Sequence, residues 1–269
     1  MLKKLLAAGA FALGLAGLLT HTAAEARTLD EIIKSGAIRV GVNPTLPPLG
    51  KFDDKNEIVG FDVDFATEIA KMLGVKLEVV QTGSPDRIPF VVANKIDFVM
   101  GAMTRNPERA KVIDFTAPVH TEVLGVLTTK DKPYTDWKQF NDPSVTFVQV
   151  RGSTPVKFIE DNLKNAKVTL LDNYPDAVRA LAQGRGTAMI DVIDFMGEHM
   201  AKHKVEWKIV ETPIDVYYCG LGVSKASTGL KDWLNVAIFE MHRRGKTDDI
   251  WKKWFGMDMI KTVGASPYF

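Results

Sequence analysis

Hydrophobic and polar positions follow two different periods along the first half of the chain. Runs rich in β-branched residues predict three strands, at residues 37–42, 75–80 and 96–100. Between the first two runs, apolar residues recur at i, i+4, i+7 and i+8 from Phe65, which is the spacing of one helical face, and Gly74 ends this pattern. A short helical pattern at residues 89–94 precedes the third strand. This order of strands and helices predicts parallel α/β layers.

The same rhythm restarts after His120. Four more strands are predicted at residues 123–129, 145–150, 168–171 and 187–192, with helices at 156–163 and 175–183. A return strand at 217–223 and helices with one apolar face complete the pattern. No polar low-complexity linker separates the two α/β units, so we expect two lobes joined by strands and not by a flexible tether.

The first 26 residues form a separate segment. A basic start precedes an uncharged stretch from Leu5 to Thr20, and residues 24–26 have the small-x-small pattern of a cleavage site. The alternative is a membrane anchor, but the apolar stretch is shorter than the roughly 20 residues that a spanning helix needs. We therefore expect residues 1–26 to be a cleaved signal peptide and the mature protein to be soluble in the periplasm of a Gram-negative cell.

Charge and cysteine content narrow the function classes. The chain has 34 basic and 33 acidic residues, and removal of the signal peptide takes away two lysines and one glutamate, leaving 32 of each. Such a balance gives no electrostatic attraction to nucleic acid or to an anionic membrane. Cys219 is the only cysteine, which excludes an intramolecular disulfide and leaves no thiol near the cleavage site for a lipid anchor. With 46% apolar residues, the mature chain can bury one large core or two smaller ones.

Two strings of residues in the first half carry the most information. They are Ile58-Val-Gly-Phe-Asp-Val-Asp64 and Ile96-Asp-Phe-Val-Met-Gly-Ala-Met-Thr-Arg-Asn-Pro-Glu-Arg109. Together they resemble the ligand-binding half of the amino-acid-type, family 3, solute-binding proteins of ABC importers. The resemblance extends over essentially all of residues 27–256. It implies the α/β periplasmic binding protein fold of type II, in which two hinge strands join two α/β lobes and the ligand binds in the cleft between them.

The resemblance implies that Thr104 and Arg109 hold a ligand carboxylate. The pairing is physically sound, because guanidinium presents a planar fork of donors that matches a carboxylate. The intervening Asn106-Pro107-Glu108 favours a helical turn that points Arg109 back toward the strand end. Without the resemblance, a single arginine on a loop would be a solvated surface charge.

Three more residues of the first lobe receive ligand-binding roles from the resemblance alone. The backbone carbonyl of Ala102 would accept a hydrogen bond from a ligand ammonium group, and the ring of Phe61 would stack over the ligand. Met103, the next residue after Ala102, is predicted to be a ligand contact in the same segment. The alternatives are a solvated carbonyl at a strand end and an aromatic residue of the core.

A second binding segment, Arg151-Gly152-Ser153-Thr154-Pro155, follows a predicted strand and precedes a predicted helix. It matches the Gly-Ser/Thr-Thr turn of the family. Gly152 permits a tight turn, Thr154 is the expected N-cap, and Pro155 suits the first helical position. Free N–H groups at such a helix start attract an anion, so Ser153 and Thr154 would hold the same carboxylate from the second lobe. The alternative is an ordinary capped helix start.

The chain departs from the family where a ligand ammonium group is usually neutralised. Asn43 stands where amino-acid binders commonly carry an aspartate, and an ungapped match puts Val192 at the acidic position of the second lobe. Asp191 precedes that position and Asp194 follows it, and a slip of one residue turns a strand side chain to the other face. We expect Asp191 to serve; a site with neither carboxylate would imply a ligand without a free amine.

The remaining candidates have ordinary explanations. Arg87 and Arg105 could reach a ligand side chain, which weakly favours an acidic or polar ligand. His199 and His203 are one helical turn apart, but no third metal ligand is evident, so we expect a solvated helix face. Cys219 is expected to be a small buried apolar residue. The sequence therefore predicts neither a metal site nor a cofactor.

These observations predict that residues 27–120 and 217–269 form lobe 1 and residues 121–216 form lobe 2. The predicted function is capture of a small carboxylate-bearing solute, a polar or acidic amino acid, by lobe closure, followed by delivery to the permease of an ABC transporter in the inner membrane. The protein is expected to act as a monomer.

The alternative function is a cyclohexadienyl dehydratase-like enzyme on the same fold. Such an enzyme needs a buried carboxyl group as general acid. We expect no glutamate near Asn43, Thr104, Ser153 or Asp191, which disfavours catalysis. A receptor sensor domain is also disfavoured, because no spanning segment follows the second lobe.

Overall fold

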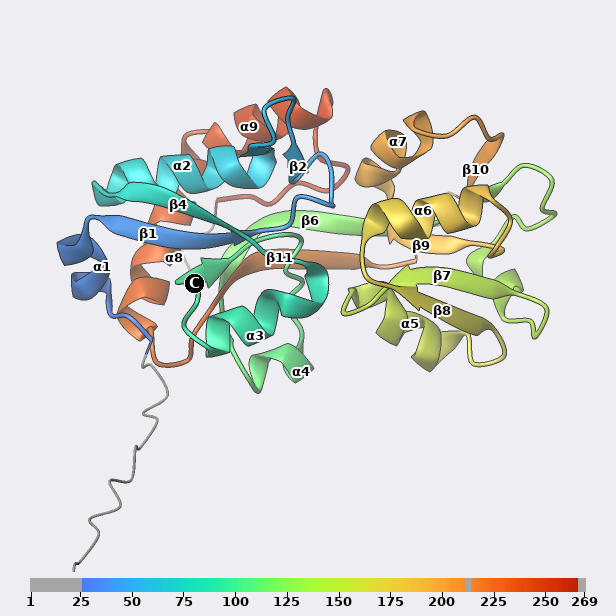
Figure 1. Ribbon diagram of the computed structural model, residues 1–269, viewed down its shortest axis with the longest axis horizontal. Helices are drawn as coiled ribbons and strands as arrows, with labels where there is room; N and C mark the ends of the chain where they lie inside the picture. The colour runs from blue at the N-terminus through green and yellow to red at the C-terminus, as the bar shows by residue number, and fades with distance from the viewer. Residues whose placement is uncertain (1–25, 211–213, 266–269) are drawn as a thin grey trace, which may run out of the picture.

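The computed structural model describes residues 26–210 and 214–265. Nearly all of the predicted signal peptide therefore lies outside the described residues. Two bodies lie side by side and are connected by long strands (Figure 1). None of the helices that the described residues form is long and apolar enough to cross a membrane.

The sheet of the first lobe follows the parallel rhythm that the sequence predicts. Strand β1 pairs in parallel with β4 on one side and with β5 on the other, and β11 adds to β5 in the antiparallel direction. Strand β6 continues this sheet into the second lobe, where β9 and β10 pair with it, so the full order is β10-β6-β11-β5-β1-β4 with β9 also paired to β6. The bounds are β1 Ala37–Val42, β4 Lys76–Gln81, β5 Phe98–Val99, β6 Asp114–Thr129, β9 Met189–Val192, β10 Trp207–Val210 and β11 Val216–Val223.

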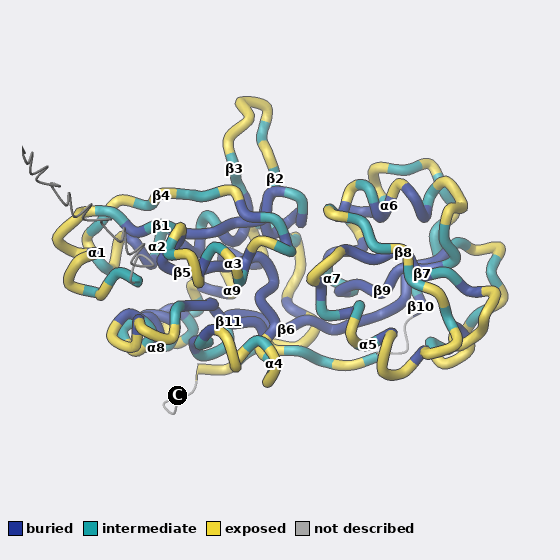
Figure 2. The backbone as a smooth tube through the Cα atoms, turned by 60° about the horizontal axis from the view of Figure 1, so that its bottom comes forward, coloured by how far each residue is buried: buried dark blue, intermediate teal, exposed yellow. Residues whose placement is uncertain are grey.

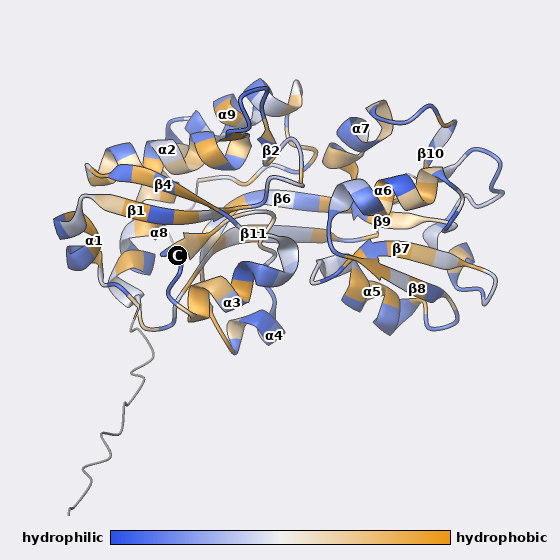
Figure 3. Ribbon diagram, viewed as in Figure 1, coloured by the Kyte–Doolittle hydropathy of each residue, from blue (hydrophilic) through white to orange (hydrophobic). Residues whose placement is uncertain are grey.

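Helices cover this sheet with one apolar face each. On α2, Phe65 and Ile69 are buried, while Met72, which the sequence pattern places on the same face, is exposed at the end of the helix. Apolar and polar bands alternate along α2 in Figure 3. The helical elements of this lobe are α1 Leu29–Ser35, α2 Phe61–Leu73, the 3-10 turn η1 Ser84–Asp86, α3 Arg87–Val92, α4 Pro107–Ala110, α8 Thr228–Arg243 and α9 Lys246–Phe255, and a small hairpin joins β2 Lys51–Phe52 to β3 Ile58–Val59.

The second lobe repeats the strand and helix alternation on a smaller scale. Strands β7 and β8 pair in parallel, and an isolated bridge from Phe147 to Ala188 connects β7 to the segment before β9. The elements are the 3-10 turn η2 Trp137–Phe140, β7 Thr146–Val150, α5 Thr154–Asn162, β8 Lys167–Leu171, α6 Tyr174–Ala182 and α7 Ile193–Ala201.

Two strands, β6 and β11, connect the lobes. The first half of β6 pairs with β11 up to the pair Val123–Val216, and its second half pairs with β9 from Leu124 onward. The sequence pattern predicts a new strand beginning at residue 123, but β6 is continuous over 16 residues. Its path is dark blue for most of its length in Figure 2, so it is buried in both lobes. The lobe boundaries at residues 120 and 216 fall on these two strands and stay a prediction.

Gly60 fixes the start of helix α2. Its φ is 146°, and the next two backbone N–H groups, of Phe61 and Asp62, donate to the carbonyls of Pro48 and Leu49 at 3.1 and 3.0 Å. These bonds satisfy donors that a helix start leaves free. A Cβ on Gly60 would lie 2.2 Å from the Leu49 carbonyl oxygen, so only glycine fits between the loop and the helix.

This close approach gives a stability prediction. Gly60→Ala should lower the free energy of unfolding by more than about 3 kcal/mol, because the new methyl group meets backbone and the φ is unsuitable for alanine. Gly74→Ala is the matched control at the other end of α2: its φ is 74°, but no atom lies within 4 Å of a Cβ there. The control should lose only about 1 kcal/mol in urea unfolding followed by circular dichroism. Equal losses would contradict the steric explanation.

Candidate ligand-binding site

A small cavity of about 10 Å³ lies between the two lobes. A space of that size has room for about one water molecule. Its walls come from both lobes and from the connecting strand β6, and most of them are polar. The lining residues are Arg87, Ala102, Thr104, Glu122, Leu124, Ser153, Thr154, Pro155, Tyr174, Asp191 and Val192.

The hydroxyl group of Thr104 connects the walls of this cavity. It is buried, donates to the Glu122 carboxylate at 2.9 Å, and lies 2.7 Å from the hydroxyl of Thr154 across the cleft. Residue 104 follows the end of β5, where Ala102 has a φ of 56°. The structure therefore brings the two threonines, predicted from separate motifs, into direct contact.

Arg109 points into the gap between the lobes. As the sequence predicts, Asn106 and Pro107 begin a helical turn, α4, and the Asn106 side chain accepts a hydrogen bond from the Arg109 amide. The guanidinium donates to the carbonyl of Thr104 at 2.9 Å and to that of Gly152, in the other lobe, at 3.0 Å. Burial and then the charge of Arg87 lower the pKa of Arg109 to about 10. Its role toward a carboxylate stays a prediction.

Arg87 has a larger structural role than the sequence suggests. It is buried and donates to the carbonyls of Ser84, Gly101, Ala102 and Gly152. The Ala102 carbonyl is the expected acceptor for a ligand ammonium group, and in the structure a protein cation lies there instead. A solvated loop arginine would have no such contacts, so only the tertiary structure reveals this role.

The second-lobe turn lies against Thr104 and supplies an unpaired hydroxyl. Ser153, and not Thr154, is the N-cap of α5, so the expected cap is wrong by one residue. The Ser153 side chain makes no capping bond, and its buried Oγ has no hydrogen-bond partner within the part of the chain that the structure describes. A buried hydroxyl without a partner is unfavourable, which makes this atom ready to contact a ligand.

Asp191 lies in the cavity wall, as expected, whereas Asp194 does not. One oxygen of Asp191 accepts from the amide of Val192 at 2.8 Å, and the other lies 3.1 Å from Nε2 of His199. His199 is buried and its ring stacks on Tyr174, so the expectation of a solvated helix face is wrong for this residue. Among the described residues, no group of three or more potential ligands could hold a metal ion.

The sequence does not predict three residues that line the cavity, Glu122, Leu124 and Tyr174, and Glu122 is the acidic one among them. It lies on β6 and is 4% exposed, and burial raises the pKa of its carboxyl to about 7. The expectation that no glutamate lies near Thr104 and Asp191 is therefore wrong. The omission has a physical cause, because Glu122 is distant in sequence from every site motif and reaches the cavity only through the continuous path of β6. An acidic residue within an otherwise apolar strand pattern was the available signal.

Four predicted site residues do not line this cavity. Arg109 lines a neighbouring pocket together with Gly152 and the turn that follows it, and the other three lie elsewhere. Phe61 is fully buried in an aromatic cluster, 5.5 Å from Trp251 and 5.8 Å from Phe65 between ring centroids, so its expected stacking on a ligand is replaced by a core role. Asn43 donates to Ser84 and accepts from Thr45. Met103 packs in a second apolar cluster of the first lobe. None of the three lines the cavity.

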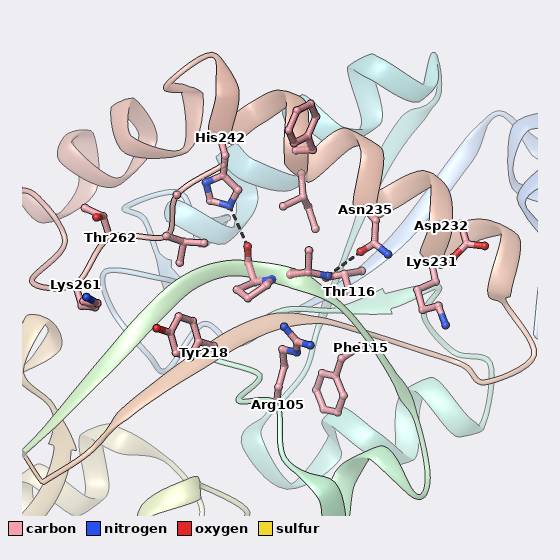
Figure 4. A pocket seen from close by; sticks show the side chains of 16 residues that line it. Arg105, Phe115, Thr116, Tyr218, Lys231, Asp232, Asn235, His242, Lys261 and Thr262 are labelled. Atoms are coloured by element: carbon pink, nitrogen blue, oxygen red, sulfur yellow. Dashed lines mark hydrogen bonds between the residues drawn. The ribbon is translucent and has the colours of Figure 1, made fainter. Parts of the chain in front are cut away.

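A larger pocket of about 730 Å³ lies on the outer side of the first lobe, against α8 and the strands β6 and β11 (Figure 4). His242 contacts the Pro118 carbonyl at 2.9 Å, and Asn235 accepts from the amide of Ala117 at 2.7 Å. Of the arginines considered from the sequence, Arg105 lies here and not in the cleft. Arg105 is exposed there, which fits the ordinary explanation of a solvated arginine better than a contact with the ligand.

The buried carboxyl of Glu122 predicts a pH-dependent stability. Its pKa is raised in the folded protein, so folding retains a proton that the unfolded chain loses, and stability falls as pH rises from about 4.5 to above 7. Glu122→Gln should remove this pH-dependent contribution, which is at most about 3 kcal/mol. The free energy of unfolding of the variant minus that of the wild type should therefore be more positive at pH 8 than at pH 5. Urea unfolding at both pH values measures the difference. A variant whose stability differs from the wild type equally at both pH values would contradict the prediction.

Comparison with known proteins agrees with this architecture. Residues 38–257 match the sequence profile of the family described as "Bacterial extracellular solute-binding proteins, family 3". The ABC transporter glutamine-binding protein GlnH of Bacillus subtilis (strain 168) is 30% identical over 236 residues, which are 86% of this chain and 85% of that protein. The glutamate/aspartate import solute-binding protein of Escherichia coli (strain K12) is 27% identical over 239 residues, 85% of this chain and 79% of that protein.

Solved structures of amino-acid-binding proteins are also similar. The ancestral amino acid-binding protein AncCDT-1, a precursor of cyclohexadienyl dehydratase, has a TM-score of 0.77 at 32% identity, with 84% of this chain and 98% of that chain covered. The solute receptor for L-cysteine of Neisseria gonorrhoeae has a TM-score of 0.79 at 29% identity, with 85% and 93% covered. The resemblance inferred from the two sequence strings and the two-lobed α/β fold are therefore confirmed. This chain belongs to the family 3 bacterial extracellular solute-binding proteins.

Proposed function

We propose that the mature protein acts in the periplasm as a monomer that captures an α-amino acid with an uncharged polar side chain and delivers it to the permease of an ABC importer. Similar proteins are named for glutamine, glutamate or aspartate, arginine, cystine and cysteine, which all have an α-carboxylate and an α-ammonium group. The observation that carries the proposal is a polar cavity whose walls come from both lobes and include the unpaired hydroxyl of Ser153.

The proposed donors for the ligand carboxylate are three hydroxyl groups of the cavity wall and one guanidinium from a neighbouring pocket. Thr104 supplies a hydroxyl from the first lobe, and Ser153 and Thr154 supply hydroxyls from the second. Arg109 adds a guanidinium whose hydrogen bond to the Gly152 carbonyl a carboxylate would replace. Charge-assisted hydrogen bonds of this kind contribute about 1.5 to 3 kcal/mol each, while micromolar affinity requires about 8 kcal/mol, so donors from both lobes must act together.

Charge balance favours a zwitterion without further charge. Asp191 provides a carboxylate for the ammonium group, and Glu122 lies in the same cavity. Among the described residues neither Arg87 nor Arg109 forms an ion pair with these two carboxyl groups, although the charge of Arg109 acts on Glu122. A ligand of zero net charge therefore adds no further uncompensated charge to the cavity. An acidic side chain would add an unpaired negative charge, and the proposal accordingly prefers a polar, uncharged side chain.

Binding requires movement of the lobes. The cavity has room for about one water molecule, which is far less than an amino acid needs. The two connecting strands, β6 and β11, are where such a hinge motion would bend the chain. A ligand that contacts both lobes stabilises the closed form by the difference between its affinities for the two forms.

A thermal-shift screen of the twenty standard amino acids, followed by calorimetric titration, tests the proposal. Arg109→Ala should weaken the tightest amino acid by about 10- to 100-fold, because a charged donor to the carboxylate is lost. Arg105→Ala is the matched control, since this guanidinium lies in the outer pocket, and its dissociation constant should stay within about twofold of the wild type. An undiminished melting shift in Arg109→Ala would refute the carboxylate assignment.

A dehydratase-like activity is the second candidate, because Glu122 is a buried carboxyl group whose pKa of about 7 suits a general acid. We propose that the chain is not an enzyme, in keeping with the binding proteins that it resembles. Incubation with prephenate should give no phenylpyruvate above the uncatalysed rate, measured by absorbance. Turnover that Glu122→Gln abolishes would establish the enzymatic alternative instead.

A further inference from the structure

Glu122 is a buried carboxyl group without an oppositely charged partner. It forms no salt bridge within residues 26–210 and 214–265, and its hydrogen bond comes from the neutral hydroxyl of Thr104 at 2.9 Å. It faces the same cavity as Asp191, which likewise has no lysine or arginine partner there. Two carboxyl groups and an unpaired Ser153 hydroxyl thus line one small cavity. A buried carboxylate is strongly unfavourable unless a cation or donors compensate it.

We propose that Glu122 is a ligand contact that receives the ammonium group of the captured amino acid together with Asp191, and that binding there displaces a proton from Glu122 into solvent. The inference rests on the proposed function and assigns the ammonium end of the ligand to the connecting strand β6.

The position of Arg87 supports this assignment. Its guanidinium donates to the carbonyls of Gly101 and Ala102, so the backbone acceptors at the end of β5 already have a cationic partner. A ligand ammonium group placed there would lie against a like charge. The cavity offers two anionic side chains as alternatives, Glu122 and Asp191, and they come from neighbouring strands, with Leu124 of β6 paired to Val192 of β9. An ammonium group between them would satisfy both.

The groups around Glu122 determine its proton occupancy. Burial and, to a smaller extent, the charge of Asp191 raise its pKa, while the hydroxyl of Thr104, the thiol of Cys219 and the charge of Arg109 lower it, and the net result is a pKa of about 7. The titratable and charged groups that face it are Asp191 on β9, Arg109 on α4, Tyr174 on α6, and Tyr217 and Cys219 on β11. Glu122 therefore retains much of its proton at pH 6, before a ligand binds.

The proton balance follows directly. The amino acid enters the site with its ammonium group fully protonated, and the ammonium group keeps all of its protons in the complex. The cationic group favours the carboxylate form of Glu122, which releases its proton to the buffer while a hydrogen-bonded ion pair forms. Below pH 7, affinity for the amino acid should therefore rise with pH, by at most about tenfold per pH unit.

Isothermal titration in two buffers of different ionisation enthalpy counts the released protons. The probes are L-glutamine, L-glutamate and L-arginine, each paired with its analogue that has hydrogen in place of the α-amino group: glutaramate, glutarate and 5-guanidinopentanoate. With the tightest amino acid at pH 6, the wild type should release between about half a proton and one proton. Glu122→Gln should release essentially none, and its affinity should not change between pH 5.5 and 7.5.

The analogues separate contact from positioning. If Glu122 contacts the ammonium group, Glu122→Gln weakens the amino acid at pH 7.5 by about tenfold or more and leaves the analogue nearly unchanged. If Glu122 merely positions Thr104, amino acid and analogue weaken equally, which would overturn the proposal. Asp62→Asn is the matched control: burial raises the pKa of Asp62 to about 7 as well, but this carboxyl bonds the amide of Gly101 and does not line the cavity. It should leave proton release unchanged.

The outcomes also separate this inference from the proposed function. Amino-acid binding with no proton release, or with release that persists in Glu122→Gln, overturns the role of Glu122 and leaves the proposed function intact. Failure of every probe and of the twenty standard amino acids to bind the wild type overturns both. Thermal unfolding of Glu122→Gln checks that the variant is folded, and at pH 8 it should melt no lower than the wild type.

Discussion

A closed cleft between two lobes requires that the polar groups it buries find partners, and this constraint determines the arrangement around the cavity. The carbonyl of Gly152 accepts from the guanidiniums of both Arg87 and Arg109, and Thr104 contacts Thr154. Each of these contacts crosses from one lobe to the other. Hydrogen bonds therefore fix the turn before α5, the short helix α4 and the end of β5 relative to one another. A large apolar surface inside the cavity has no part in this.

Local chemistry explains which features could be predicted from the sequence. The turn that positions Arg109 depends on Asn106 and Pro107, three and two residues away, and the start of α5 depends on Ser153 and its immediate neighbours. The strand and helix alternation depends on apolar spacing within single elements. Features of this kind are set by neighbouring residues, and the structure agrees with them to within a residue or two.

The rest of the site depends on contacts between distant segments. Arg87 finds its acceptors 14, 15 and 65 residues away, and the side chain of Phe61 is enclosed by α9, which lies near the other end of the chain. Glu122 lies inside a strand whose continuity across both lobes no local pattern predicts. The burial of these side chains follows from the packing of whole elements, so periodicity and motif spacing could not reveal it.

The pairing of β6 changes partner beside Glu122, from β11 at Val123 to β9 at Leu124. The same few peptide units thus carry a buried carboxyl group and form the joint about which the lobes would rotate. Loss of the proton from this group and its pairing with a ligand ammonium group would alter the electrostatic free energy at the pivot itself, where a small change in backbone angle moves an entire lobe. A protein with this geometry would respond to the charge of its ligand more directly than to the size of the ligand. A transporter that recognises the orientation of the lobes would then select ligands by charge in the same way.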